Sequence, residues 1–322
     1  MGDETIQRDE SHSDLAKPEG LLYHYTDDKG LYGILDSKEI WATHYRFLND
    51  LAEQKEGSAL LYSFLDETSL EFTGLFRSEI KIMYDIQLTQ MQLFIASFSE
   101  DSADTDGGDR LSQWRGYSSG RAGYSLGFDG SLLRTKAESL MEKTVLPVFL
   151  CRCIYSTEIK DEIKRKIKSI FEEKVESKLE IFSQKWAKVY RDNVEMYQMK
   201  RNIRIREFRE IAFDPLRDEF REWCAMLKHE GFMEEREWRL VCYVHDEVTD
   251  LKFVQFRDRQ YGHTPNIQVP LGLSDSDSPL KRIVVGPSQN QDQDVISLKI
   301  DLAKRGIRGV EITLSKIPYR NW

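Results

Sequence analysis

The sequence predicts a mixed α+β protein in which a long helical segment interrupts a domain rich in strands. Short apolar runs suited to strands lie between residues 21 and 155, and similar runs return after Gly231. Between them, apolar residues recur at intervals of three and four, the pattern of an amphipathic helix. We therefore expect an α+β domain formed by residues 20–155 and 232–322, with a helical insertion over 156–231.

Size and composition indicate a globular protein with a substantial core. The chain has 322 residues, of which 40% are hydrophobic, and its formal net charge is −9. This charge gives no overall attraction to nucleic acid or to anionic membranes. The polar residues 1–19 predict a flexible arm without a signal peptide, and the four cysteines are too few and too oddly spaced for a disulfide framework. We expect a cytoplasmic protein with reduced thiols.

The first half of the chain predicts strands and one short helix. Residues 21–26 are rich in aromatic and other strand-forming side chains, and the turn-like cluster at 27–30 precedes a helix over 31–37. An acidic loop is expected at 100–109. Further strands are expected at residues 93–99, 123–128 and within 145–155.

The insertion is expected to hold three helices. An apolar stripe from Ile159 to Val189 predicts one long helix if it is continuous, a second helix ends before Pro215, and a third covers about 216–228. Residues 158–230 contain 18 basic and 16 acidic residues, so this section is more cationic than the rest of the chain.

Strand patterns return in the last third of the chain. Strands are expected at residues 237–244, 253–256, 283–287 and 310–315. A helix over 295–305 is expected to end at Gly306, because glycine readily adopts the left-handed conformation that closes a helix.

Several enzyme classes are disfavoured because their motifs are missing from the sequence. There is no phosphate-binding loop, no dinucleotide-binding glycine pattern, no hydrolase nucleophile elbow and no zinc-protease motif. The six histidines and four cysteines do not cluster at metal-ligand spacing. We therefore expect no metal cofactor.

Two polar features lie on or beside predicted strands. In the first, His24 and Thr26 share one strand face, since side chains alternate, although a lone strand histidine is commonly structural. In the second, an aromatic and polar cluster precedes a glycine-rich strand, and its rings are suited either to a core or to stacking on a flat ligand. That cluster comprises Ser97, Ser99, Trp114, Arg115 and Tyr117.

A third polar feature opens the strand at 237–244. In an extended strand Glu235, Glu237 and Arg239 lie on one face, and Trp238 lies on the other. Two carboxylates and a guanidinium on a strand that enters the core are costly unless they are paired or used. A salt-bridged rim and a catalytic site are therefore the two interpretations.

The ordered set of motifs resembles the bacterial DUF2971 family. The resemblance covers nearly everything from Leu21 to Arg320 except the helical insertion. It rests on residues 22–26, Trp41, 47–50, Glu53, 98–100, Trp114, Tyr117, 123–129, 235–239, Ser315 and 317–320.

This resemblance implies the compact two-sheet split β core of the ADP-ribosyltransferase superfamily, whose members cleave NAD with a His-Tyr-Glu triad. By position, His24 matches the histidine that holds an NAD ribose hydroxyl, and Glu237 matches the catalytic glutamate. Tyr117 is the best match for the aromatic residue that stacks on nicotinamide, with Tyr124 as its rival. Some members of this superfamily are toxins of toxin-antitoxin or anti-phage defence systems, so the resemblance also implies a toxin-like effector.

The chemistry of NAD cleavage suits these residue types. A carboxylate such as Glu237 stabilises the oxocarbenium-like transition state, and Glu235 is a candidate general base for the acceptor. Arg115 and Arg239 are candidate ligands of the pyrophosphate, although Arg239 is also placed to pair with Glu237. The expected NAD-binding set therefore comprises His24, Tyr25, Thr26, Ser97, Ser99, Trp114, Arg115, Tyr124 and Arg239.

The insertion suggests a partner of the expected transferase. Basic residues cluster at 160–168 and again at 200–209, where they are suited to a nucleic-acid backbone, and nearby aromatic residues are candidates for base stacking. These aromatic candidates are Tyr190, Tyr197 and Phe208. We expect a nucleic-acid acceptor, with RNA favoured over DNA, and a protein acceptor as the alternative. A solvated helix face and a surface for an inhibitory partner such as an antitoxin are further interpretations.

Two competing functions stay open. One is a glycosidase-like hydrolase that uses Glu235 and Glu237, although carboxylates two residues apart on one strand are poorly placed on opposite sides of a sugar. The other is a non-catalytic module that binds NAD or RNA without turnover.

Overall fold

The structure is a computed structural model with two compact units. The first unit includes residues 17–48, 93–153 and 232–318, and the second includes residues 154–231. The backbone is described for residues 17–48, 92–101, 106–118, 122–144, 146–155, 157–216, 222–223, 225–244, 251–259 and 262–318. Outside these ranges lie part of the expected arm and five residues on which the family resemblance rests, namely residues 49, 50, 53, 319 and 320.

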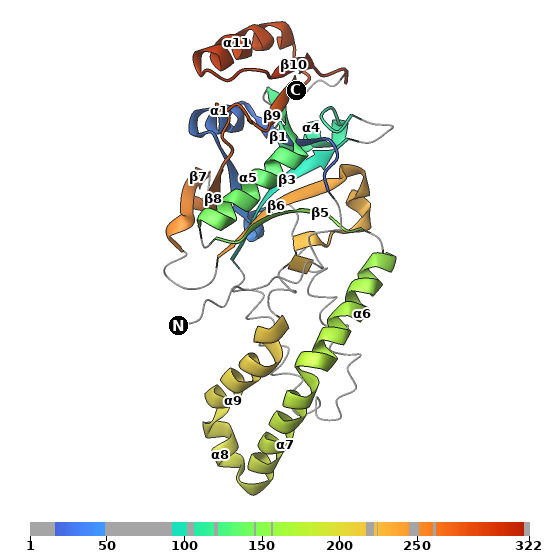
Figure 1. Cartoon of the computed structure of the whole chain (residues 1–322), viewed down its shortest axis with the longest axis vertical. Coiled ribbons are helices and arrows are strands. Elements are labelled where there is room, and N and C mark those ends of the chain that lie inside the picture. Colours follow the sequence, from blue (N-terminus) through green and yellow to red (C-terminus); the bar gives the residue numbers. More distant parts are fainter. Residues whose placement is uncertain are drawn as a thin grey trace. The chain divides into compact units, whose positions relative to one another are not determined.

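The first unit is a mixed α+β structure built on an open sheet (Figure 1). In the described ranges the sheet has 10 strands, in the order β10-β9-β4-β1-β3-β2-β8-β7, and β6 pairs with β3 and β5 off this path. The strands are β1 (Leu21–Asp27), β2 (Glu39–His44), β3 (Gln92–Glu100), β4 (Gly123–Asp129), β5 (Val148–Arg152), β6 (Glu237–Val244), β7 (Val254–Arg259), β8 (Gly262–Pro270), β9 (Leu280–Val285) and β10 (Glu311–Leu314). The mixed α+β class and the multi-stranded sheet that the sequence predicts are thereby confirmed.

The sheet branches at β3. Its C-terminal residues Ser99 and Glu100 pair with β1, whereas Phe94 and Ile95 near its N-terminus pair with β2. The strands β1 and β2 therefore share one partner, and hydrogen bonding through β3 makes the sheet continuous rather than two separate sheets. The residues of β3 between these two pairings lie where β1 and β2 separate.

Helices cover the apolar face of this sheet. They are α1 (Asp28–Ser37), α5 (Gly130–Lys143) and α11 (Gln291–Lys304), and the aliphatic side chains of each join the main core cluster. Two aspartates begin the first two of these helices, because Asp27 accepts a hydrogen bond from Gly30 N and Asp129 accepts one from Leu132 N. The opposite face carries a smaller cluster that includes Trp114 of α4 (Leu111–Tyr117).

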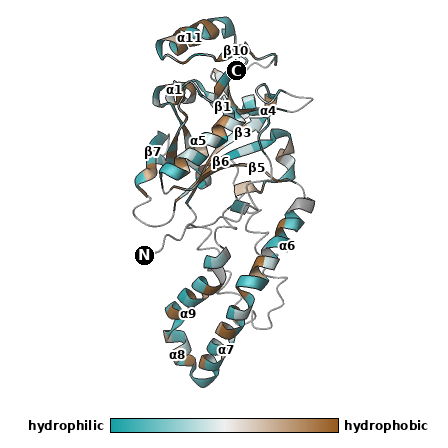
Figure 2. Ribbon diagram, viewed as in Figure 1, coloured by the Kyte–Doolittle hydropathy of each residue, from teal (hydrophilic) through white to brown (hydrophobic). Residues whose placement is uncertain are grey.

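The second unit is helical, as the apolar spacing predicts. Its helices are α6 (Thr157–Lys174), α7 (Glu176–Asp192), α8 (Val194–Met199) and α9 (Arg201–Phe208), followed by a π turn at Arg209–Phe213 and a short 3-10 turn at Asp214–Leu216. Figure 2 shows hydrophilic and hydrophobic residues interleaved along these helices. The expected single helix is interrupted at the buried Val175, and Asn193 begins α8 by accepting a hydrogen bond from Met196 N.

Three residues expected to contact nucleic acid are instead part of the core of this second unit. Arg204 is 2% exposed, lies over the Tyr197 ring at 3.7 Å and donates to the Tyr197 carbonyl oxygen at 2.8 Å. Tyr197 and Phe208 are buried too, so their rings are not available to stack on bases. Tyr190 and the cations Arg201 and Arg206 are exposed, and the expectation of a nucleic-acid surface now depends on such residues.

Among the described residues, no helix combines the length and the apolar character needed to cross a bilayer.

Candidate functional site

His24 of β1 lies where the sheet branches. Its Nδ1 is 2.9 Å from the Ser97 carbonyl oxygen, and its ring is 5.7 Å from the Phe98 ring. Because a carbonyl oxygen only accepts, Nδ1 carries the proton and donates it. Burial is the larger cause that lowers the pKa of His24, and the positive charge of Arg257 lowers it further, against the raising effect of the Ser97 hydrogen bond. The imidazole is therefore neutral at pH 7, and Nε2 is a hydrogen-bond acceptor.

The lowered pKa of His24 predicts a pH dependence of stability. As the pH falls below the ordinary value of 6.5, the unfolded chain takes up a proton before folded His24 does, so the folded state loses stability. From about pH 7 to about pH 5, we expect the native protein to lose more unfolding free energy than His24→Gln, by at most about 1.4 kcal/mol per pH unit. Urea denaturation of both proteins at each pH measures this difference, and parallel pH curves would contradict it.

Arg257 of β7, whose charge lowers the pKa of His24, contacts two residues of β2. Arg257 Nη2 donates to Thr43 Oγ1 at 3.3 Å, and the Arg257 guanidinium lies 5.9 Å from the centre of the Trp41 ring. Asp27 influences the same guanidinium electrostatically. Arg257 and Thr43 carry no signal in the sequence, because only strand pairing through β8 brings residue 257 toward β2.

Glu237 and Arg239 form a buried ion pair at the start of β6. Arg239 Nε donates to Glu237 Oε1 at 3.1 Å, and Nη2 donates to Oε2 at 3.0 Å. Cys153 Sγ lies 3.5 Å from the same Oε2. The side chains of the pair are 5% and 2% exposed, so the pairing interpretation of the sequence is correct. The expected role of Arg239 in binding pyrophosphate is wrong, because its guanidinium is buried against this carboxylate.

The expected alignment of Glu235 with Glu237 on one strand face is wrong. Glu235 ends a 3-10 helix, η4 (Glu230–Glu235), and β6 begins only at Glu237. Arg236 between them has φ of 45°, a left-handed backbone that turns the chain and breaks the alternation of side chains. A general-base role for Glu235 therefore loses the geometry on which it was based.

The predicted triad residues lie on different faces of the sheet. His24 alternates with Tyr23 and Tyr25 and shares its face with Leu22 of the main core. Glu237 precedes Trp238 of that core and therefore points to the opposite face. The structure thus does not bring the two side chains together.

The predicted aromatic residues have different environments. Tyr124 pairs with Thr26 across β1 and β4 and is buried in the main core, where burial raises its pKa to about 12. Tyr117 on α4 is 40% exposed. Of these rivals, Tyr117 is the more exposed.

Most of the remaining predicted ligands have structural roles. Tyr25 donates to the Gly107 carbonyl oxygen at 2.7 Å and packs edge-on against Trp114, with ring centres 4.8 Å apart. Thr26 lies against the backbone of Gly30 in the first turn of α1. The backbone carbonyl of Ser97 orients His24, and Ser99 is buried. Arg115 is exposed on α4 and remains a candidate ligand.

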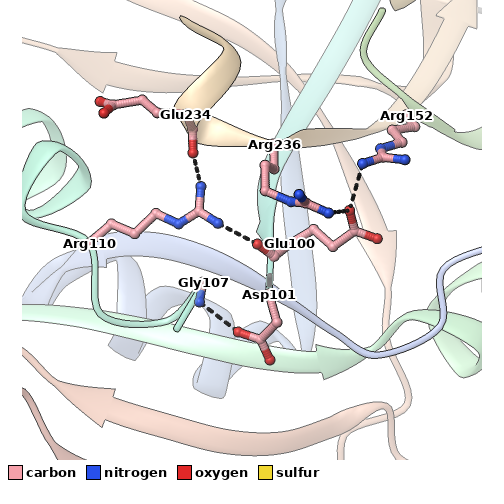
Figure 3. Close-up of polar contacts among 7 residues, drawn as sticks. All are labelled: Glu100, Asp101, Gly107, Arg110, Arg152, Glu234 and Arg236. Atoms are coloured by element: carbon pink, nitrogen blue, oxygen red, sulfur yellow. Dashed lines mark hydrogen bonds and ion pairs between the residues drawn. The ribbon is translucent and has the colours of Figure 1, made fainter. Parts of the chain in front are cut away.

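An arginine cluster lies at the C-terminal end of β3 (Figure 3). We define it as Arg110, Arg152 and Arg236, which surround Glu100. In the described part of the chain, Nε of Arg110 and Nε of Arg236 are buried without a hydrogen-bond partner, an arrangement that costs about 1–3 kcal/mol for each group. The sequence assigns no role to these arginines, because residues 110, 152 and 236 are far apart in the chain.

Comparison with known proteins supports the family resemblance over part of the chain. A model of the DUF2971 family, described as a protein of unknown function, matches residues 113–240. This stretch includes Trp114, Tyr117 and Glu237, and it contains the helical insertion, which our own resemblance left out. No curated protein and no solved structure matches the chain.

Proposed function

We propose that the protein is an NAD-dependent ADP-ribosyltransferase that binds NAD beside His24 and transfers ADP-ribose to a macromolecular acceptor. The observation that carries this proposal is the fixed neutral tautomer of His24, whose Nδ1 donates to Ser97 O. Its Nε2 is a directed acceptor for a ribose hydroxyl group at the branch of the sheet. Arg257, whose charge acts on His24, and its hydrogen-bond partner Thr43 supply further polar groups.

Glu237 is the carboxylate proposed to stabilise the positive charge that develops on the sugar as nicotinamide leaves. For this role the Glu237 carboxylate must leave Arg239 and contact the substrate instead. It must also become accessible from the sheet face that carries His24. A change in the pairing of β6 with β3 is therefore part of the proposal. An RNA acceptor, a toxin-like role in defence and a cytoplasmic location accompany the proposal as expectations from the sequence.

The Glu237–Arg239 pair specifically favours a second candidate, a module that binds NAD without cleaving it. A carboxylate held by two hydrogen bonds, and only 5% exposed, is suited to a structural role. This module keeps the His24 acceptor and binds NAD, and no nicotinamide is released.

The two candidates are separated by measuring nicotinamide release from NAD by the purified chain, with RNA, DNA, protein lysate or no acceptor added. Under the transferase proposal we expect release with at least one addition, lowered about 100-fold or more in His24→Gln and in Glu237→Gln. His263→Gln is the matched control, because His263 is exposed on β8 and its Nδ1 contacts the exposed Asp258 Oδ1 at 2.9 Å. Isotope-labelled NAD identifies the acceptor that gains ADP-ribose.

Each outcome decides between the candidates once thermal melts show that the variants fold. NAD binding without release, weakened in His24→Gln, supports the binding module. Neither binding nor release overturns both candidates. If Glu237→Gln fails to fold, the comparison of His24→Gln with His263→Gln still decides.

A further inference from the structure

The arginine cluster concentrates positive charge around one carboxylate. Oε2 of Glu100 lies 3.2 Å from Nη2 of Arg152 and accepts a hydrogen bond from Nη2 of Arg236 at 3.2 Å, so two guanidinium groups share one oxygen (Figure 3). These arginines come from separate places in the first unit, the end of β5 and the residue before β6. A single carboxylate oxygen is a poor match for two planar forks, each of which is suited to two acceptor oxygens.

Arg110 adds a third cation that has neutral hydrogen-bond partners. Its Nη2 donates to the Glu100 carbonyl oxygen at 2.6 Å, and its Nη1 donates to the Glu234 carbonyl oxygen. The residue is 8% exposed, and burial lowers its pKa, with the nearby Arg236 charge contributing. Three guanidinium groups are therefore gathered where one carboxylate makes the ion pairs.

Two nearby acids, Asp101 and Glu234, are turned away from the cluster. Asp101 Oδ1 accepts the backbone N–H of Gly107 at 2.6 Å, and in Figure 3 the Glu234 carboxylate points away from the arginines. Both acids lower the local potential, but neither carboxylate makes an ion pair with Arg152 or Arg236 in the described part of the chain. A ligand with several anionic oxygens can supply what Glu100 provides only in part.

One side of the cluster is open to solvent. The side chains of Arg152 and Arg236 are 43% and 38% exposed, whereas that of Glu100 is 16% exposed. The side chains of Arg152 and Arg236 thus reach solvent beside a largely covered carboxylate, and Arg110 is buried. The cluster therefore has a buried cation, Arg110, and two solvent-accessible cations, Arg152 and Arg236.

We propose that Arg152 and Arg236 bind a phosphoryl group, with Arg110 as the buried positive charge behind them and Glu100 as an internal counter-ion. A phosphoryl group has enough oxygen atoms to accept hydrogen bonds from two guanidinium groups at once, whereas a carboxylate has only two oxygen atoms. The diphosphate of a dinucleotide and the backbone of a nucleic acid share this chemistry. The site does not depend on cleavage of NAD.

Titration of the full chain with inorganic pyrophosphate, followed by calorimetry, tests the site directly. We expect Arg152→Gln and Arg236→Gln each to weaken binding about 10-fold or more, because each removes charge-assisted hydrogen bonds. Arg134→Gln is the matched control, since Arg134 has a surface ion pair with Glu138 on α5 and lies outside the cluster. Its affinity is expected to equal that of the native protein.

Glu100→Gln separates a ligand site from a purely structural ion pair. Removing the internal counter-ion is expected to tighten pyrophosphate binding about 10-fold, whereas a structural cluster gains nothing from the change. The proposal is overturned if neither the native protein nor Glu100→Gln binds pyrophosphate. It is also overturned if Arg152→Gln and Arg236→Gln both bind pyrophosphate as tightly as the native protein does. If Glu100→Gln does not fold, the arginine variants decide.

Competition identifies the source of the phosphoryl group. Displacement of pyrophosphate by ADP-ribose assigns the site to a dinucleotide, and displacement by a short RNA without terminal phosphates assigns it to a nucleic-acid backbone. Pyrophosphate that neither competitor displaces overturns the assignment to these sources. Because these measurements need no nicotinamide release, failure of the proposed transferase leaves them unaffected.

Discussion

Replacing Arg239 by methionine is expected to lower the free energy of unfolding by about 3–5 kcal/mol. The substitution removes both donors to Glu237 and leaves a carboxylate that is only 5% exposed without its cation. Removing one partner of a buried pair costs more than the pair contributes, because the remaining charge has lost its water as well. Urea denaturation monitored by tryptophan fluorescence measures the change.

A neutral double variant distinguishes the lost pair from lost packing. Glu237→Gln combined with Arg239→Met removes both charges, and we expect it to recover most of the stability that Arg239→Met loses. Arg134→Met is the surface control, expected to change unfolding free energy by less than about 1 kcal/mol. A loss below about 1 kcal/mol in Arg239→Met would show that Glu237 reaches solvent, as the catalytic proposal requires.

Replacing Trp114 by alanine is expected to destabilise the first unit by about 3–5 kcal/mol. The indole is fully buried, contacts the Tyr25 ring edge-on and donates from Nε1 to Asp109 at 2.8 Å. The backbones of Gly123 and Gly286 lie directly against it, since a Cβ atom on either would approach the ring to 3.2 Å or 2.9 Å. A cavity here has rigid walls, so little relaxation offsets the lost contacts.

Trp114→Phe separates the ring volume from the indole hydrogen bond. We expect it to retain much of the stability that alanine loses, with a remaining deficit because Asp109 loses one donor. Asp109 keeps its hydrogen bond to Lys316 N at 2.7 Å, which limits that deficit. Equal losses in both variants, measured by thermal and urea denaturation, would contradict the cavity explanation.

Local patterns predicted many elements near their observed bounds. Strand-forming residues at 21–26 lie in β1, and the alternation from Glu237 onward describes β6, where Trp238 enters the core and Arg239 points to the other face. Other elements lack such a signal. The short β2 and the helix α5 were not predicted, because their stability comes from burial of a few side chains such as Ile40 and Leu133 against the sheet.

The candidate sites depended more strongly on tertiary structure. The spacing of Glu235 and Glu237 implies one strand face, but the left-handed conformation of Arg236 places Glu235 in a different element. Likewise, the basic spacing at 200–209 gives no sign that Arg204 is buried between aromatic rings. Side-chain type and spacing therefore described the available chemistry but not its exposure.

The sequence by itself determined the mixed α+β class, the helical character of residues 157–208, the alternation of faces in β6 and the resemblance to DUF2971. These properties follow from local periodicity and from short motifs, which the chain carries without reference to distant residues. Only the tertiary structure decided the branch at β3, the pairing of Glu237 with Arg239 and the meeting of Arg110, Arg152 and Arg236 around Glu100. Each of these depends on strand register and burial, which long-range pairing sets and which nearest neighbours in the sequence do not specify.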